Sequence, residues 1–384
     1  MDGTEHLLTE FVLIMLVALF VLFIFYWIKQ PSVVAYIVAG VVAGPFGFGI
    51  ITDSNLIHTL GEFGVLMLLF FIGMEVSITS LLKNWKVVIF GTLFQIAGSV
   101  GAITLLGHFF GWEWERVVLL GFVTSLSSTA VILSYLQSKG MLETGVGNDV
   151  VGVLLAQDVM IIPMLITISA IGGSFDTKTL LWQTMGAILI GVSLFILLRE
   201  KIKLPKLIFG TPTSNDHKLF IALVLCFGAA LITSVFHLSL GLGAFVGGVI
   251  ASNVINFGWV KDELGSFKTL FLALFFVSIG LLINIEFFTE NWFFIVAILF
   301  STLLINTFID TLVFLWLRRP LRYALYAGAL LAPLGEFSFF LASAGLQVGA
   351  IGEYAYQMAI MVIALSLILT PFWIRLFRNL SSPK

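Results

Sequence analysis

Hydrophobic blocks of similar length recur along the chain from Leu7 to Phe377, separated by short polar breaks. A hydrocarbon layer about 30 Å thick needs about 20 apolar residues per helix, and a strand needs about half as many. Within lipid every segment must satisfy its own backbone, so blocks of this length favour helices over a β-barrel. The pattern predicts thirteen spans, near residues 7 to 28, 32 to 49, 60 to 81, 87 to 110, 117 to 137, 149 to 171, 180 to 199, 218 to 236, 239 to 256, 267 to 284, 292 to 317, 322 to 346 and 355 to 377.

The composition narrows the class of protein. Of 384 residues, 60% are hydrophobic and 10% are charged, whereas soluble proteins average about 25% charged residues. The single Cys226 excludes a disulfide framework within the chain and a thiolate metal cluster. No HExxH or Walker A pattern is present and no basic arm suits nucleic acid. We therefore expect a membrane protein that is not an enzyme, has no cofactor, binds no nucleic acid and has the lipid bilayer as its partner.

Basic residues test the number of spans, because loops rich in Lys and Arg stay in the cytoplasm. All but two of the 19 Lys and Arg residues lie at the ends of odd-numbered spans, and the exceptions are Arg116 and Lys178. If one span were missed or added, the basic residues would no longer fall on one side of the membrane. We expect a multi-pass protein of the cell (inner) membrane with its N-terminus outside and its C-terminus in the cytoplasm.

A repeat emerges when the chain is compared with itself at an offset of 207 or 208 residues. Because a single helix lies between the two copies, the second copy must run in the opposite sense, as in secondary transporters. The prediction is an all-α polytopic membrane protein with a six-plus-one-plus-six inverted repeat and crossed discontinuous helices. Its single transmembrane domain, 1 to 384, comprises a first repeat at 7 to 171, a linker helix at 180 to 199 and a second repeat at 218 to 377.

Asp158 is the clearest candidate for chemistry, because it lies about ten residues into the sixth predicted span. A charged side chain at the bilayer centre costs about 2.5 to 3.5 kcal/mol on insertion scales, so it is a functional hypothesis by default. Pro163 can leave a carbonyl free nearby. Gln157 adds a neutral oxygen beside the carboxylate. The alternative roles are a buried carboxyl that fixes packing and an amide that links helices.

The fifth predicted span contains a cluster of hydroxyl side chains at mid-depth. Such residues compete with helical hydrogen bonds, so we expect a local break whose dipole ends and oxygens can replace the water around a dehydrated cation. The alternative is that the hydroxyls only link helices. The cluster consists of Thr124, Ser125, Ser127, Ser128 and Thr129.

The repeat offset carries this cluster onto residues 331 to 338 of the twelfth predicted span. Pro333 and Gly335 are helix breakers, and two corresponding broken segments are the best pointer to a binding site. Glu336 is a second acidic candidate there. It either binds the cation, pairs with a backbone dipole, or stays protonated as a structural link, since burial favours the neutral form of a carboxyl.

Three other acidic residues suggest structural roles. Glu75 and Asp310 fall near the ends of the third and eleventh spans, where we expect snorkelling or pairing with Lys83 or Arg318. We expect Asp149 to begin the sixth span, where a carboxylate suits a helix N-terminus.

These features together resemble the monovalent cation:proton antiporter-2 family, most closely its Kef-type potassium/proton members. The resemblance runs from about Leu7 to Phe377 and includes Gln-Asp in the sixth span. It implies a six-helix core domain moving against a dimerisation domain, and hence a homodimer. Kef proteins continue into a cytoplasmic nucleotide-binding domain, whereas this chain stops at Lys384, so we expect that regulatory part to be missing, cut away or carried by a separate subunit. The motifs that carry the resemblance are Ala39-Gly40, Gly44-Pro45, residues 71 to 75, residues 127 to 130, Gln157-Asp158 and residues 335 to 337.

The resulting hypothesis is exchange of a monovalent cation, potassium favoured over sodium, for a proton. Proton and cation would compete for Asp158, and the core domain would move only when the site is occupied. One carboxylate per cycle predicts electroneutral one-for-one exchange. The alternatives are a gated potassium efflux channel and a sodium-coupled symporter of the same fold; the sequence has no TVGYG-like filter.

Overall fold

The computed structural model describes residues 3–28, 30, 32–51, 54–75, 85–171, 215–236, 238, 240–253 and 265–381, with a few single residues between 181 and 192. Regular structure in these ranges is helical, apart from one isolated antiparallel bridge between Ser127 and Leu334. The predicted all-α class is therefore confirmed for the described part of the chain.

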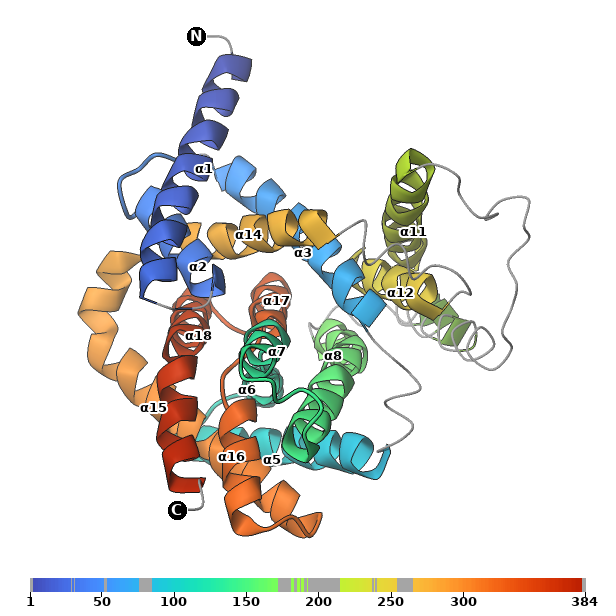
Figure 1. The fold of residues 1–384 in the computed structure, drawn as a ribbon, viewed down its shortest axis with the longest axis vertical. Coiled ribbons are helices and arrows are strands. Elements are labelled where there is room, and N and C mark those ends of the chain that lie inside the picture. The colour runs from blue at the N-terminus through green and yellow to red at the C-terminus, as the bar shows by residue number, and fades with distance from the viewer. Residues whose placement is uncertain are drawn as a thin grey trace. The chain divides into compact units, whose positions relative to one another are not determined.

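The chain divides into two compact units (Figure 1). Unit 1 consists of residues 1–50, 79–173 and 282–384, and unit 2 of residues 51–78 and 174–281. The helices of unit 1 are α1 (Gly3–Trp27), α2 (Ser32–Ala43), α5 (Trp85–Phe110), α6 (Trp114–Ser125), α7 (Thr129–Ser138), α8 (Gly145–Ile171), α15 (Ile285–Trp316), α16 (Leu321–Leu331), α17 (Glu336–Gln347) and α18 (Glu353–Ser381). Those of unit 2 are α3 (Ser54–Glu75), α11 (Asn215–Val235), α12 (Leu240–Asn253) and α14 (Gly265–Leu281).

The helices overlap every predicted span except 180 to 199, which lies largely outside the described residues. The number of spans and the inverted topology stay predictions. Among the described residues, five helical segments can cross a membrane by length and composition: Thr9–Trp27, Lys86–Phe110, Gly145–Ile168, Ile285–Trp316 and Glu353–Arg378. Shorter apolar helices lie at Ser32–Ala43, Leu219–Val235, Leu240–Ala251 and Phe267–Leu281.

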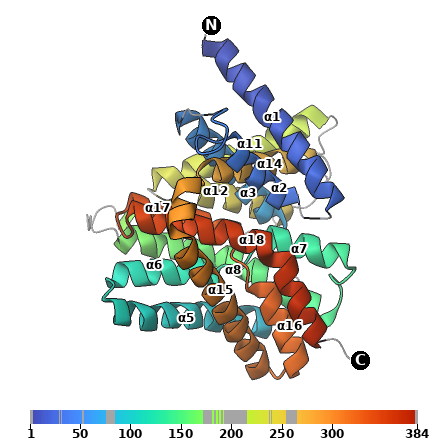
Figure 2. The same ribbon diagram turned by 90° about the vertical axis from the view of Figure 1, so that its left-hand side faces the viewer.

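Two predicted spans of unit 1 are interrupted in the middle. The fifth is split into α6 and α7, and Leu126 between them is extended, with φ −91° and ψ 125°. The twelfth is split into α16 and α17, and Gly335 is extended there, with φ −96° and ψ 170°. All four half-helices lie beside α8, and α7, α16 and α17 also lie beside α18 (Figure 1), while α5 and α6 run side by side (Figure 2).

The two interruptions satisfy each other's backbone groups. Gly335 N donates to Leu126 O at 2.9 Å, and Ser128 N donates to Pro333 O at 3.1 Å. A Cβ at Gly335 would lie 2.5 Å from Ser127 O, so only glycine permits this approach. Ser127 and Leu334 of the bridge are 207 residues apart in sequence, which is the offset of the repeat.

A hydrophobic core fills the space between α7, α8 and α16 in unit 1. It extends to Phe314 of α15 and Ile374 of α18. Because these side chains are almost fully buried, they fix how α8 lies against α16. The remaining members are Ile132, Leu136, Val150, Val153, Leu154, Ala324, Tyr326, Ala327, Leu330 and Leu331.

In unit 2, α3 packs against α12 and α14. A Cβ at Gly248 of α12 would collide with Phe70 O of α3, so the close approach of these helices depends on glycine. The glycine-rich segment 244–251, which contains Gly248, matches residues 36–43 at the offset of the sequence repeat.

Candidate functional site

Asp158 lies on α8 and is 1% exposed. The hydroxyl of Thr129, the first residue of α7, donates to both carboxylate oxygens of Asp158 at 3.1 Å. Thr129 is itself 2% exposed. The predicted carboxylate therefore contacts the N-terminal end of a half-helix, where peptide dipoles favour negative charge.

Gln157 holds the adjacent turn of α8 against the interruption between α6 and α7. Its amide nitrogen donates to Ser125 O at 3.2 Å and to the side chain of Gln95 on α5 at 3.0 Å. Its amide oxygen accepts from Ser127 N at 3.2 Å. Gln95 also donates to Ser125 O at 2.7 Å. The amide of Gln157 thus satisfies backbone groups that the interrupted helix leaves without partners.

The predicted hydroxyls divide into two groups. Ser127 donates to Leu331 O, and Ser128 donates to the carboxylate of Glu336 at 3.2 Å, so both connect the two interruptions. Thr124 and Ser125 instead donate to carbonyls within α6, at Leu120, Gly121 and Phe122. The side chains of Thr124 and Ser125 therefore point along their own helix, although the Ser125 carbonyl contributes to the Gln157 network.

Glu336 is the first residue of α17 and is 1% exposed. The peptide dipoles at a helix start favour a negative charge in this first turn. This position agrees with the alternative in which Glu336 pairs with a backbone dipole. The choice between that role, cation binding and a protonated link stays a prediction.

The structure adds a residue that the sequence analysis missed. Asn306 of α15 is 2% exposed, and its amide nitrogen donates to Thr124 O at 2.8 Å and to Ala332 O at 3.1 Å. These carbonyls lie at the C-terminal ends of α6 and α16, so one side chain joins both interruptions. The sequence feature that could have pointed to Asn306 is a four-residue spacing of polar positions within an apolar span, at Thr302, Asn306 and Asp310.

The expectation for Asp310 is wrong. Its side chain is 1% exposed, and its Oδ2 has no hydrogen-bond partner among the residues that the structure describes. It neither snorkels nor pairs with Arg318, which is exposed. The physical reason is the face of the helix, since Asp310 lies one turn from Asn306 on the buried side of α15. The side chain of Glu75 lies outside the described part of the chain.

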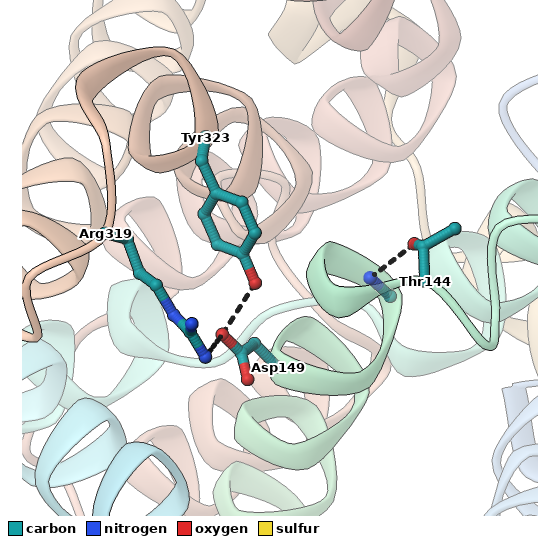
Figure 3. Close-up of polar contacts among 5 residues, drawn as sticks. Thr144, Asp149, Arg319 and Tyr323 are labelled. Carbon is teal, nitrogen blue, oxygen red and sulfur yellow. Dashed lines mark hydrogen bonds and ion pairs between the residues drawn. The ribbon is translucent and has the colours of Figure 1, made fainter.

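The expectation for Asp149 also needs correction. The helix α8 begins at Gly145, and the hydroxyl of Thr144 accepts from Gly147 N at 3.1 Å, as a helix cap does (Figure 3). Asp149 is therefore one turn inside α8. It forms an ion pair with Arg319 at 2.6 Å and accepts a hydrogen bond from the Tyr323 hydroxyl at 2.6 Å.

Thr129 brings a neutral hydroxyl oxygen to Asp158, and Gln157 carries a neutral amide oxygen at the next position of α8. Such oxygens can replace the hydration shell of a cation of low charge. In the ranges that the structure describes, no group of three or more His, Cys, Asp or Glu side chains could hold a metal ion.

Comparisons with known proteins identify the class. A family model for the transmembrane part of sodium/hydrogen exchangers matches residues 12–378. The iron transporter MagA of Paramagnetospirillum magneticum is 38% identical over 358 residues, which cover 92% of this chain and 81% of that protein.

Two relatives are potassium-efflux proteins. K(+) efflux antiporter 5 of Arabidopsis thaliana is 28% identical over 378 residues, covering 97% of this chain and 66% of that protein. The glutathione-regulated potassium-efflux system protein KefC of Salmonella heidelberg is 30% identical over 358 residues, covering 91% of this chain and 57% of KefC.

The fold has a solved counterpart. The sodium proton antiporter MjNhaP1 from Methanocaldococcus jannaschii superposes with a TM-score of 0.72 at 16% identity, covering 99% of both chains. The match to the family model over nearly the whole chain, together with the Kef-type relatives, shows that this protein belongs to the sodium/hydrogen exchanger family of membrane transporters.

Proposed function

We propose that the chain exchanges a monovalent cation for protons by alternating access, and that Asp158 binds both ions in turn. The observation that carries the proposal is the burial of Asp158 against Thr129, at the start of a half-helix within two mutually bonded interruptions. An ionised carboxylate without a counter-ion is expensive in a low-dielectric interior. Movement restricted to the protonated or cation-bound state converts competition into exchange.

The proposed ligands are oxygen atoms close to Asp158. Thr129 binds the carboxylate directly, whereas Gln157, Ser127 and Ser128 hold the two interruptions in place. Glu336 and the carbonyls of Thr124 and Ser125 complete the proposed site region. One carboxylate shared between a proton and a cation gives a one-for-one, electroneutral cycle.

The finer architecture is part of the same proposal. Thirteen spans in a six-plus-one-plus-six inverted repeat are supported by the bridge between residues 207 apart and by the matching interruptions. We place the protein in the inner membrane with its C-terminus in the cytoplasm, as a homodimer.

Potassium is the favoured cation, on the resemblance of Gln157-Asp158 to the Kef pattern and the names of two relatives. The name of MagA makes iron a second candidate. Iron(II) prefers sites that combine histidine and carboxylate ligands. The neutral oxygens near Asp158 favour a monovalent ion instead.

The test is proton flux in proteoliposomes loaded with a pH-sensitive dye, after addition of potassium, rubidium, sodium, lithium or iron(II). We expect alkali cations to drive proton flux in the wild type and Asp158→Asn to abolish it. Glu113→Gln, which removes an exposed carboxylate at the start of α6, is the matched control and should behave as wild type. Cation-dependent proton flux that survives in Asp158→Asn refutes the proposal.

The same assay separates the alternatives. Conduction that persists without a proton gradient and that far exceeds a carrier's rate identifies a channel. Sodium uptake that requires an organic anion identifies a symporter. Flux driven by iron(II) alone favours the activity that the name of MagA describes.

A further inference from the structure

Asp149 of α8 lies beside Arg319 and Tyr323, two residues that are far from it in sequence (Figure 3). Asp149 Oδ2 accepts from Arg319 Nη2 at 2.6 Å and from the Tyr323 hydroxyl at 2.6 Å, although Tyr323 is 174 residues away in sequence. The guanidinium of Arg319 also lies 5.3 Å from the centre of the Tyr323 ring. The side chain of Asp149 is 2% exposed, so two donors are directed at one buried carboxylate oxygen.

The turn between α15 and α16 places Arg319 beside Asp149. Arg318 N donates to Leu315 O, and Arg319 N donates to Phe314 O, which is the Schellman pattern at a helix end. That pattern requires a left-handed residue, and Arg318 adopts it with φ 62°. Pro320 follows and precedes the first residue of α16. The corner therefore turns sharply enough to bring Arg319 over Tyr323 in the first turn of α16.

We propose that Asp149, Arg319 and Tyr323 form an electrostatic clamp whose role is to position Asp158 relative to the two interruptions. This inference rests on the proposed function. The clamp joins α8, one turn inside its N-terminal end, to the start of α16, and both helices continue from it to the proposed site. Nine residues separate Asp149 from Asp158, or about 13 Å along the helix at 1.5 Å per residue. The other helix, α16, ends at Leu331, whose carbonyl accepts from Ser127 at the crossing.

The space enclosed by these helices is filled by the hydrophobic core. Val150, Val153 and Leu154 of α8 pack there with Ala327, Leu330 and others of α16. Close-packed interiors transmit displacement instead of absorbing it. A change at the clamp end therefore shifts α8 against α16, and Asp158 moves with α8.

Stability alone is a weak explanation for the ion pair. The carboxylate of Asp149 is buried, whereas the side chain of Arg319 is 39% exposed, so the pair lies at the edge of the interior. Replacing both partners of such a pair with apolar residues of similar volume is often neutral or stabilising, whereas removing Arg319 alone leaves the Asp149 charge uncompensated. A directional contact between rigid helices suits positioning, because it fixes one arrangement of α8 on α16.

The experiment compares the wild type with Asp149→Asn, Tyr323→Phe and the double variant Asp149→Leu/Arg319→Met in the proteoliposome assay, with melting temperature measured in parallel. We expect the apparent KM for the cation to rise about 2- to 30-fold in Asp149→Asn, as for other coupling residues, with a shifted pH profile. Tyr323→Phe keeps the ring and should show a smaller change in the same direction. The double variant should regain its melting temperature without regaining the wild-type KM.

Two matched controls remove charge from exposed neighbours, Glu143→Gln before α8 and Arg322→Gln in α16, and both should behave as wild type. If the double variant restores KM and pH profile together with stability, the three residues only support packing. The same conclusion follows if Asp149→Asn and Tyr323→Phe leave both unchanged. An active wild type with unaltered clamp variants overturns this inference alone, while a wild type without cation-dependent flux overturns the proposed function as well.

Discussion

At the scale of single residues, the candidate site combines two buried acids, Asp158 and Glu336, with neutral hydroxyl and amide groups. Thr129 shares one hydroxyl proton between both oxygens of Asp158. A hydrogen bond to a charged group contributes about 1.5 to 3 kcal/mol. Under the proposed function, we therefore expect Thr129 to take part in ion binding as well as to link α7 to α8.

Removing the Thr129 hydroxyl tests this role. We expect Thr129→Val, which keeps the shape, to raise the apparent KM for the cation about 10- to 100-fold, corresponding to one charge-assisted hydrogen bond. Thr129→Ser keeps the hydroxyl and should stay near the wild type. Cation-titrated proton flux measures both variants. Equal KM values for Val, Ser and wild type would remove Thr129 from the site.

A second residue-scale prediction concerns Asn306. Its amide satisfies carbonyls in both interruptions, and a buried polar group left without its partner costs about 1 to 3 kcal/mol. We expect Asn306→Ala to lower the melting temperature and to reduce transport. The control is Ser301→Ala, an exposed position on the same helix. A melting curve identical to that of the control would show that other groups satisfy these carbonyls.

At the scale of elements, the sequence predicted both interruptions. Hydroxyls at 124 to 129 and the breakers Pro333 and Gly335 indicated segments that cannot continue a helix, and the structure interrupts them at 126–128 and 332–335. The directions of Thr124 and Ser125 were not predictable, because Ser and Thr side chains can bond either to a partner helix or to their own preceding turn.

Contacts between distant elements were also beyond the sequence. The spacing of residues does not say which face of α15 is buried, so the sequence led to the expectation that Asp310 snorkels or pairs with Arg318. The pairing of Asp149 with Arg319 depends on the sharp corner at Arg318, a left-handed residue where glycine is usual. The opposite charges of Asp149 and Arg319 alone did not indicate that α8 contacts the turn between α15 and α16.

Gly335 provides the prediction at this scale. Any side chain there would meet the backbone of Ser127, which cannot move aside as a flexible side chain does. We expect Gly335→Ala to push the two interruptions apart, lowering melting temperature and transport together. Gly352→Ala is the control, since a Cβ at Gly352 would meet open space. Equal melting temperatures for the two alanine variants would contradict the close approach.

At the scale of the whole molecule, membership of the sodium/hydrogen exchanger family and a fold like that of MjNhaP1 agree with the resemblance inferred from the sequence. Short motifs such as Gln157-Asp158 carried that resemblance, whereas the recurring hydrophobic blocks carried the all-α class, because lipid allows few alternatives to helices. The number of spans is harder to establish from the helices, because interrupted and short helices fall below the length by which a spanning segment is recognised. The candidate site lies within unit 1.

The hydrogen bonds between the two interruptions also limit how such a molecule can be assembled. Leu126 O and Ser128 N find their partners at Gly335 N and Pro333 O, which are synthesised about two hundred positions later. During translation these two groups of the first interruption therefore have no such partner until the second interruption leaves the ribosome. The candidate site can accordingly be completed only after most of the chain has been inserted.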